Sequence, residues 1–243
     1  MCYYNGQRVT YAEYLRLKEI EKELRLLKLK DRPLLSGFDN LSSSILVAND
    51  DKTDVDVIEA HWEFLPSHLQ SYEEVVEFRK KFSTVNAKSE NLLSSSLYKE
   101  AALKGRCLVW SHGFYEWRHL GKIKQPYHIR VKEQGYFYIA GIYNNWLDSE
   151  SGELIPTYAI VTTRANRFME QIHNSKLRMP TILPEELAYE WLLGDIEEER
   201  IRELAGYQID PSLMEAFTID KNFRQSDEPD KRLDQPHIPA IVL

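Results

Sequence analysis

Cys2 is the residue whose position most clearly points to chemistry, because it directly follows the initiator methionine. Methionine is commonly removed before a small second residue, which would make Cys2 the N-terminal residue. An α-amine of pKa about 7.7–8 and a thiol of pKa about 8.5 would then stand on adjacent carbons. This pair reacts with aldehydes: the amine forms an imine, and the thiolate closes a thiazolidine ring at high effective molarity. The alternative is an incidental cysteine.

Glu116 lies in an aromatic segment, Trp110 to Trp117, that has the pattern of a strand. Side chains alternate along a strand, so Phe114 and Glu116 share one face and Tyr115 and Trp117 share the other. A carboxylate among aromatic rings loses hydration, and its pKa rises toward neutrality, which suits a group that accepts and returns a proton. The alternative is an edge-strand glutamate that faces solvent.

His173 closes a predicted helix over residues 164–173, and Asn174 follows it. The partial negative charge at a helix C-terminus favours an imidazolium, so His173 is a candidate proton donor near pH 7. A simple helix cap is the alternative. A metal site of His112, Glu116, His119 and His173 is disfavoured, since strand positions four residues apart lie about 13 Å apart. We therefore expect no metal and no cofactor.

Composition and pattern predict the fold. The chain has 243 residues, of which 43% are hydrophobic, which is enough for a substantial core. No apolar run approaches the roughly 20 residues of a membrane span, the N-terminus lacks an apolar signal region, and two cysteines are too few for a disulfide framework. We expect Cys107, inside an apolar strand, to pack in the core.

Short strands are grouped in the middle of the chain, and helices lie at both ends. The predicted strands are 45–48, 55–64, 107–110, 113–117, 126–131, 136–141 and 157–162, and the predicted helices are 11–30, 164–173, 184–193 and a stretch after 195 that ends at 206. This order predicts an α+β fold in which helices flank a bent, partly barrel-like mixed sheet. We expect one domain over 1–243, with a tail from 226 to 243, and a solvated surface for the acidic run at 185–199.

Several segments, in order along the chain, resemble the SRAP family, the SOS-response-associated peptidases that are also described as abasic-site processing proteins. The resemblance runs from residue 2 to about 225. The matching segments are Met1-Cys2, Trp62 to Pro66, Asn86 to Glu90, Arg106 to Val109, Gly113 to Trp117, Pro126 to Ile129, Ala140 to Tyr143 with Trp146, Ala159 to Asn166, and His173 with Arg178 to Pro180.

The resemblance implies that Cys2, once Met1 is removed, forms a thiazolidine with the ring-opened aldehyde of an abasic site in single-stranded DNA. Asn86 would hold the amine end of Cys2. Glu116 would move protons and assist the removal of Met1, and His173 would protonate the sugar oxygen as the ring opens. The same two proton carriers would serve reversal of the crosslink.

The net charge of −7 means that any DNA binding depends on a local basic patch. The candidates for DNA contact are the cations Lys88, Arg106, Arg164 and Arg178, with Trp62 and Phe64 as surfaces on which flanking bases stack. We expect a cytoplasmic monomer that is associated with the nucleoid when DNA is damaged. Its expected partners are single-stranded DNA with abasic sites and replication-fork proteins, with no membrane contact.

Four departures from the family pattern suggest a variant DNA groove around an intact centre. Tyr3 and Tyr4 follow the cysteine where many members have Gly-Arg, and Lys88 stands where arginine is usual. Residues 174–177 lengthen the gap between His173 and Arg178, and His68 replaces a tryptophan. Two alternative functions remain: a cysteine peptidase with an N-terminal nucleophile that acts on other peptides, and a non-catalytic single-stranded DNA binding module.

Overall fold

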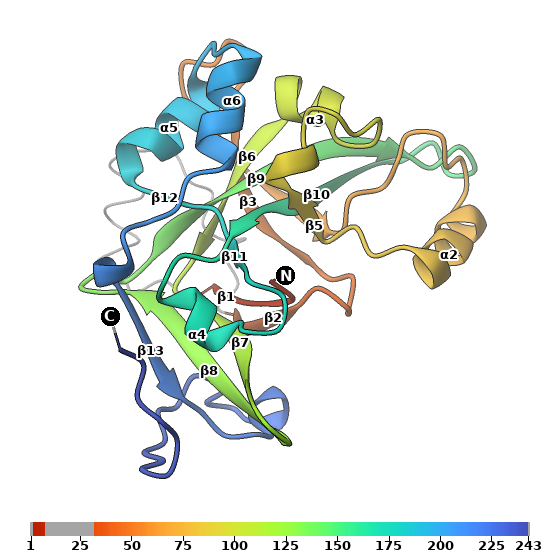
Figure 1. Ribbon diagram of the computed structural model, residues 1–243. Coiled ribbons are helices and arrows are strands. Elements are labelled where there is room, and N and C mark those ends of the chain that lie inside the picture. The colour runs from red at the N-terminus through yellow and green to blue at the C-terminus, as the bar shows by residue number, and fades with distance from the viewer. Residues whose placement is uncertain (1, 8–31, 243) are drawn as a thin grey trace.

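Five strands form a closed, barrel-like sheet at the centre of the protein. A computed structural model describes residues 2–7 and 32–242 (Figure 1). The strands follow one another around the ring in the order β10 (Leu154–Arg164), β4 (Val55–Trp62), β3 (Ser42–Ala48), β6 (Arg106–Ser111) and β9 (Phe137–Leu147). Pairing of β9 with β10 closes the ring. The β10–β4 pair is parallel and the other pairs are antiparallel, which confirms the expected mixed sheet.

Short strands extend the sheet beside the C-terminal end of β10. They are β5 (Asn86–Lys88), which is parallel to β10, and β11 (Arg178–Pro180), which is antiparallel to it. Thr162 of β10 pairs with Lys88 on one side and with Pro180 on the other. This register brings the segments around residues 86 and 178 together, although 92 positions separate them in the sequence. A further short strand, β12 (Ile182–Leu183), pairs with β9.

A second, antiparallel sheet packs against the barrel. Its strand order is β13 (Met214–Thr218), β8 (Ile123–Val131), β7 (Gly113–Leu120), β1 (Tyr4–Gln7) and β2 (Arg32–Ser36). Because β1 lies between β7 and β2, the residues that precede β1 are held next to the strand that carries Glu116. One apolar cluster contains side chains of both sheets, which makes the α+β fold a single domain.

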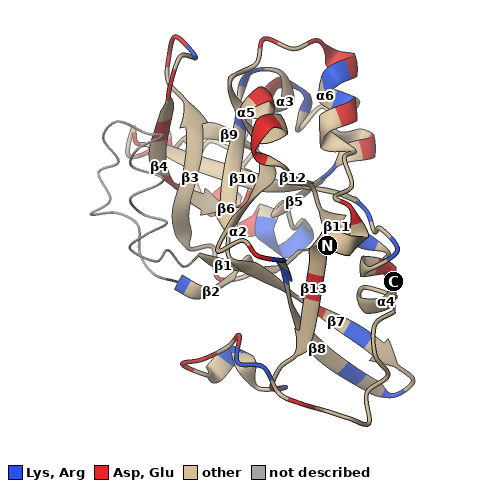
Figure 2. Ribbon diagram, turned by 90° about the vertical axis from the view of Figure 1, so that its left-hand side faces the viewer, with Lys and Arg blue, Asp and Glu red and all other residues tan. Residues whose placement is uncertain are grey.

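The helices lie outside the sheets. They are α2 (Tyr72–Lys81), α3 (Lys99–Lys104), α4 (Met169–Ile172), α5 (Glu185–Leu193) and α6 (Glu198–Ala205), with 3₁₀ turns at 89–91, 211–213 and 223–225. The two predictions that correspond to α5 and α6 are confirmed, and these helices carry the acidic run, as Figure 2 shows. The predicted helix over 11–30 lies outside the described residues. None of the described helices is long and apolar enough to cross a lipid bilayer.

The prediction of a helix over 164–173 is wrong for most of its length. Strand β10 continues to Arg164, and α4 begins only at Met169. The Asn166 side chain accepts a hydrogen bond from the Met169 amide at 3.0 Å, so this asparagine starts the helix late. The prediction for Cys107 is confirmed, since its side chain is fully buried in the core. Gly141 leaves room for it: a Cβ at Gly141 would lie 2.8 Å from the Cys107 Sγ.

Candidate active site

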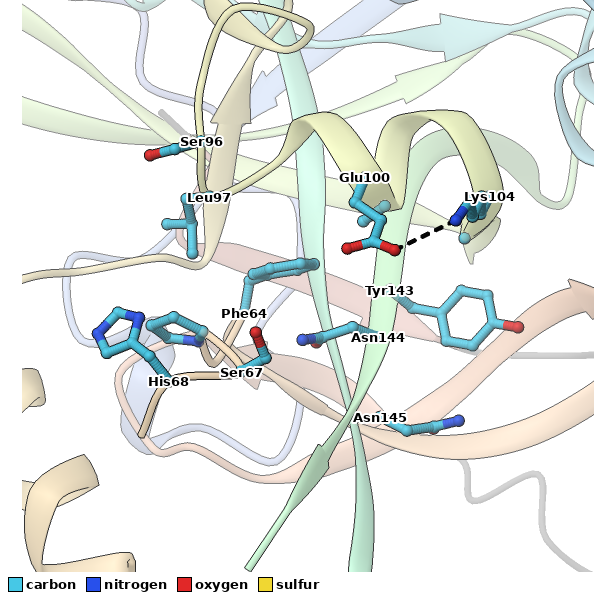
Figure 3. Close-up of a pocket in the computed structure, with 13 residues that line it drawn as sticks. Phe64, Ser67, His68, Ser96, Leu97, Glu100, Lys104, Tyr143, Asn144 and Asn145 are labelled. Carbon is cyan, nitrogen blue, oxygen red and sulfur yellow. Dashed lines mark hydrogen bonds and ion pairs between the residues drawn. The ribbon is translucent and has the colours of Figure 1, made fainter. Parts of the chain in front are cut away.

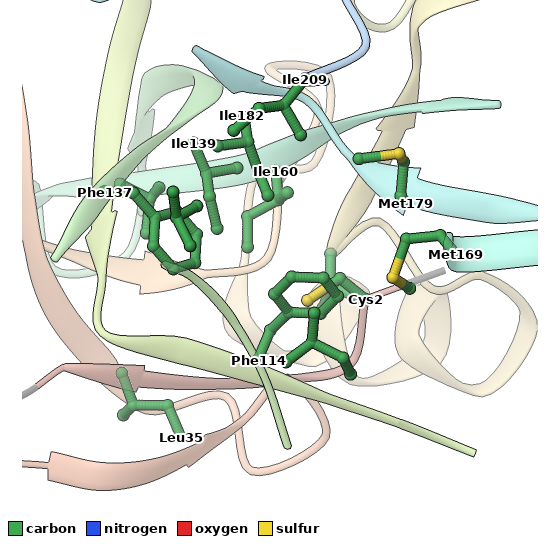
Figure 4. Packing of buried hydrophobic residues seen from close by; sticks show 14 of the residues in the cluster. Cys2, Leu35, Phe114, Phe137, Ile139, Ile160, Met169, Met179, Ile182 and Ile209 are labelled. Atoms are coloured by element: carbon green, nitrogen blue, oxygen red, sulfur yellow. The ribbon is translucent and has the colours of Figure 1, made fainter. Parts of the chain in front are cut away.

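Cys2 lies in the core, two residues before the first residue of β1. Its side chain has no exposed surface, and its thiol donates a weak hydrogen bond to the Tyr4 carbonyl, with Sγ and O 3.6 Å apart. Figure 4 shows the side chain among packed residues that include Phe114 and Met169. Burial raises the thiol pKa far above its ordinary value, and the charge of Glu116 raises it further. With residue 1 still present in the chain, the thiol is therefore protonated at neutral pH.

Asn86 binds the backbone of Cys2. The Asn86 Nδ2 donates to the Cys2 carbonyl oxygen at 2.9 Å, and this bond crosses from β5 of the barrel to the chain segment that enters the second sheet. The other side-chain atom, Oδ1, is buried and finds no hydrogen-bond partner within residues 2–7 and 32–242. A buried amide oxygen without a partner is costly, so this acceptor is suited to an N–H or O–H donor that arrives with a reaction.

Glu116 points inward from β7, on the same face as Phe114. Its side chain is buried, and loss of hydration raises its pKa to about 8. This result confirms the expected direction of the pKa and excludes a glutamate that faces solvent. At pH 7 the carboxyl group therefore carries a proton, which it can donate as a general acid.

His173 follows α4 and lies opposite Glu116. Its Nδ1 is 2.7 Å from the Arg178 carbonyl oxygen, and because a carbonyl only accepts, Nδ1 carries the hydrogen. Its Nε2 faces Glu116, with 3.8 Å between Nε2 and Oε2. Burial lowers the pKa of His173 to about 4. The expectation of an imidazolium near pH 7 is therefore wrong, since loss of hydration outweighs the small dipole of a four-residue helix.

Together Glu116 and His173 form a neutral pair at pH 7. The carboxyl group holds one proton, and the imidazole, with its hydrogen on Nδ1, can accept a proton at Nε2. Their separation of 3.8 Å is longer than a hydrogen bond, and a substrate hydroxyl beside the pair can lie within hydrogen-bond distance of both groups. The arrangement can thus donate and accept a proton on one small substrate group.

The Asn174 side chain binds the backbone of β7, the strand that carries Glu116, and so holds the loop after His173 against it. Its Nδ2 donates to the His119 carbonyl at 2.9 Å, and its Oδ1 accepts from the His119 amide at 3.0 Å. The side chain thereby pairs with β7 as a peptide group of a neighbouring strand would. The extra residues 174–177 therefore still hold His173 against β7. Sequence reasoning treated Asn174 only as a helix stop and missed this role.

Three of the predicted cationic contacts lie together near the site. Lys88 is exposed, and the Arg164 side chain is 82% exposed with its Nε 3.7 Å from Glu90. Arg178 donates from Nη1 to Glu90 and from Nη2 to the Thr162 carbonyl, each at 2.5 Å. Its Nε is buried and has no partner within the described residues. Arg178 is thus held rigidly and keeps one donor free.

The structure contradicts the DNA-contact prediction for Arg106. Arg106 is buried, and its guanidinium donates to the carbonyls of Trp191 at 2.6 Å and Gly194 at 2.5 Å. It also donates to the carbonyls of Ala102 and Leu103. These are carbonyls at the ends of α3 and α5, so Arg106 satisfies helix C-termini rather than a phosphate.

The prediction of base stacking on Trp62 and Phe64 is also contradicted. Trp62 is 1% exposed, stacks on Tyr158 and donates from Nε1 to the Val85 carbonyl. Phe64 is 2% exposed and contacts the edge of Tyr98. Only a small part of Phe64 reaches a separate cavity of about 520 Å³, shown in Figure 3, which contains none of the predicted catalytic residues. Both rings were misassigned because a core aromatic and a base-stacking aromatic look alike in a sequence.

Comparison with known proteins agrees with the resemblance in the sequence. The family described as SOS response associated peptidase (SRAP) matches residues 11–225. Over 112 residues, 46% of this chain and 48% of the relative, the chain is 36% identical to abasic site processing protein YoqW of Bacillus subtilis. Over 191 residues, 70% of this chain and 54% of the relative, it is 33% identical to abasic site processing protein HMCES of Gallus gallus.

A solved protein structure shares the fold of this chain. An X-ray structure of a protein from Bacteroides thetaiotaomicron superposes with a TM-score of 0.84 at 29% identity, covering 96% of this chain and all of that one. The alignments with the two curated relatives span about half the length of each. The family match covers most of the sequence, and the chain therefore belongs to the SRAP family.

Proposed function

We propose that this protein captures abasic sites in single-stranded DNA by forming a thiazolidine with Cys2 after Met1 has been removed. The observation that carries the proposal is the contact of Asn86 with Cys2, 2.9 Å from Nδ2 to the carbonyl oxygen, beside a Glu116–His173 pair. Relatives that carry the name abasic site processing protein support the same substrate.

The chemistry begins with the Cys2 amine and the C1′ aldehyde of the opened sugar. The amine adds to C1′ to give a carbinolamine, and protonation of its hydroxyl expels one water and leaves an imine. The thiol sulfur then adds to the imine carbon, and the nitrogen takes up the thiol proton, so the ring closes with loss of one water overall. As the sugar ring opens, neutral Glu116 donates its proton to the ring oxygen, and His173 Nε2 accepts the proton of the C1′ hydroxyl and returns it to Glu116. Glu116 then supplies the proton for departure of water.

Removal of Met1 acts as the activating step. While Met1 is present, the nitrogen of Cys2 is an amide without nucleophilic character, and the thiol is buried and protonated. Hydrolysis of the Met1–Cys2 bond converts that amide to an amine next to Asn86. The free Asn86 Oδ1 is then available to accept from the new amine, and Glu116 takes part in this self-processing. The peptidase description of the family corresponds to this step.

The DNA strand is held by Lys88, Arg164 and Arg178 at the edge formed by β5, β10 and β11. Lys88 and Arg164 offer exposed charges to the phosphates, and the guanidinium of Arg178 adds positive charge behind them. With so few cations, and a net charge of −7, we expect a weak dependence of binding on salt.

Denaturing gels with an oligonucleotide that contains one abasic site test the proposal. Wild-type protein with Met1 removed, verified by intact mass, is expected to give a lesion-dependent shifted band. Cys2→Ala should abolish that band, and Cys107→Ala, which alters the other fully buried thiol, should keep it. Binding without a shifted band would instead indicate a non-covalent single-strand binding module. Cleavage of a peptide in trans, without DNA reaction, would indicate a peptidase.

A further inference from the structure

Residues 233–242, which we call the strap, cross the second sheet and have no part in the chemistry above. The strap lies beyond residues 11–225, the part of the chain that the SRAP family matches. It begins beside β13, where the Leu233 amide donates to the Thr218 carbonyl at 2.8 Å and the Leu233 carbonyl accepts from the Thr218 hydroxyl. It ends beside α4, where Figure 2 shows the C-terminal end of the chain.

The strap runs over the face of the second sheet that carries Glu116. Glu116 pairs with Tyr127 of β8, and Tyr127 pairs with Thr218 of β13, so these three side chains share one face. A cavity of about 680 Å³ lies between this face and the strap, and Tyr127 and Thr218 are among the sheet residues that line it. The strap is therefore held at separate points rather than packed along its whole length.

One of these points is α4, the helix that ends next to His173. The Gln171 Oε1 accepts from the Val242 amide at 2.9 Å, and the Gln171 Nε2 donates to the Val242 carbonyl at 2.5 Å. Helix α4 has only four residues, and so short a helix depends on contacts with the rest of the protein for its stability. The two bonds to the strap are such contacts, and His173 directly follows the helix that they hold.

Another point is β7, two residues after Glu116. Side chains alternate along a strand, so Arg118 lies on the same face as Glu116. The Arg118 Nη1 donates to the Pro239 carbonyl of the strap. Pro239 and Val242 are three residues apart, so one short piece of chain binds both the strand of Glu116 and the helix that precedes His173.

Apolar side chains add to these polar contacts. Ile238 and Ile241 of the strap are partly buried and pack against the apolar cluster that includes Met169 and Ile172 of α4. Burial of these two side chains favours binding of the strap, while the hydrogen bonds determine where it lies. The strap thus forms a second link between α4 and β7, in addition to the bonds of Asn174 with His119.

We propose that the strap is a positioning element for the catalytic pair: by binding Arg118 of β7 and Gln171 of α4, it fixes His173 relative to Glu116. The proposal rests on the function proposed above and adds to it a segment that acts through the two proton carriers. Release of the strap removes these contacts of α4, so the 3.8 Å between His173 Nε2 and Glu116 Oε2 is no longer fixed. Proton transfer depends on such geometry.

A chain that ends at Arg232 tests the proposal, because it lacks the strap. With Met1 removed and verified by intact mass, it should react more slowly with the closed-ring sugar, by up to about a hundredfold, the effect that a displacement of about 1 Å can have. A synthetic peptide of residues 233–243, added in trans at millimolar concentration, should restore the rate. The same peptide with serine in place of Ile238 and Ile241 is the control and should restore little.

Gln171→Ala tests the same contact within the full chain. It should slow the reaction less than removal of the strap does, and it should have no further effect in the chain that ends at Arg232. Gln134→Ala, in the exposed segment between β8 and β9, is the matched control and should react as wild type does. Independent effects of Gln171→Ala and removal of the strap would overturn the proposal, because Gln171 would then act elsewhere.

The titration of His173, followed by its NMR resonances, needs no DNA and therefore tests the strap even if wild type forms no crosslink. Without the strap, water should reach the imidazole, and the pKa of His173 should rise from about 4 toward its ordinary value. Loss of stability alone would leave this titration unchanged. An unchanged titration in both the shortened chain and Gln171→Ala would overturn the proposal. If the shortened chain does not fold, Gln171→Ala compared with Gln134→Ala decides the question.

Discussion

Glu63 and Glu116 are two buried carboxyl groups in different parts of the protein, and the structure neutralises them in different ways. Glu63 follows β4 and is bound by both the Nε and Nη2 of Arg79 from α2. Glu116 lies on β7 next to His173, and its pKa is raised to about 8. Glu63 takes a cation as its partner, whereas Glu116 keeps a proton. Only the second can serve in acid–base chemistry, so burial alone does not identify a catalytic carboxyl group.

The largest effect is expected from Glu116→Gln compared with Glu63→Gln. Glu116→Gln removes the transferable proton and should slow crosslinking about 10²- to 10⁴-fold, the usual contribution of a general acid. Glu63→Gln weakens the link to α2 and should lower the free energy of unfolding by about 1–3 kcal/mol, while crosslinking changes little. Single-turnover gels and chemical denaturation measure the two effects. The comparison fails if both variants lose activity in proportion to their stability.

Glu116→Gln also tests self-processing. Intact mass after purification should show that the variant keeps Met1 while Glu63→Gln loses it. Complete loss of Met1 from Glu116→Gln would remove Glu116 from that step. Because retained Met1 itself blocks crosslinking, the crosslinking rate of Glu116→Gln must be measured on protein whose N-terminal Cys2 has been exposed by cleavage of a fusion partner.

His173→Ala should have the next largest effect, about a hundredfold on reaction with the closed-ring sugar, the lower end of the usual contribution of a general base. The reason is that His173 Nε2 accepts the C1′ hydroxyl proton as the ring opens, whereas Nδ1 only fixes the imidazole to the Arg178 carbonyl. His68→Ala is the control, since His68 lines the separate cavity of Figure 3. A pre-opened aldehyde substrate should rescue much of the loss. Equal rates for His173→Ala and wild type on the closed-ring sugar would exclude the role.

The pH dependence of stability gives a smaller and more specific effect. Between pH 4.5 and 8 the folded chain keeps a proton on Glu116 that the unfolded chain has lost, so stability falls as pH rises. His173 acts in the opposite direction between pH 4 and 6.5, because there the unfolded chain binds the proton. Of these two groups, only Glu116 therefore changes the stability with pH above pH 6.5.

Urea unfolding at pH 6.5, 7.2 and 8 measures this effect. Relative to Glu116→Gln, wild type should lose at most about 1.4 kcal/mol per pH unit across this interval. The reference variant removes the contribution of every other titrating group, because both proteins share them. Parallel stability curves for the two proteins would mean that Glu116 is already ionised at pH 6.5.

The sequence predicted the sheets and the centre of the site better than its edges. Alternating patterns located β7, and with it the face that Glu116 shares with Phe114, because that pattern depends only on local geometry. The pKa of His173 could not be predicted in this way, since its direction depends on burial by strands far away in the sequence. Arg106 and Trp62 were misassigned for a related reason: whether an arginine meets a carbonyl or a phosphate is decided by tertiary packing.

The sequence also did not predict the pairing of β5 and β11 with β10. These strands have three residues each, which is too short for a periodic pattern. Their register nevertheless determines that Asn86 reaches Cys2 and that the Arg178 carbonyl reaches His173. The residue types of the site were thus readable from motifs, whereas the contacts between them depend on long-range pairing.

The smallest effect is expected at Asn174, which holds the Glu116–His173 pair without touching the substrate. Asn174→Ala removes both bonds to His119 and should slow crosslinking to the closed-ring sugar a fewfold, since His173 would no longer be held at 3.8 Å from Glu116. Asn174→Asp keeps the acceptor but loses the donor, so its rate should fall between those of wild type and Asn174→Ala.

A purely structural role for Asn174 would lower stability without changing the titration of the pair. Histidine resonances of His173 therefore provide the deciding measurement. If the two Asn174 hydrogen bonds set the geometry, Asn174→Ala should let water reach the imidazole. The pKa of His173 should then shift from about 4 back toward its ordinary value. An unchanged His173 titration in Asn174→Ala would mean that packing of α4 alone positions the imidazole, and that Glu116 and His173 hold their neutral states without help from the loop.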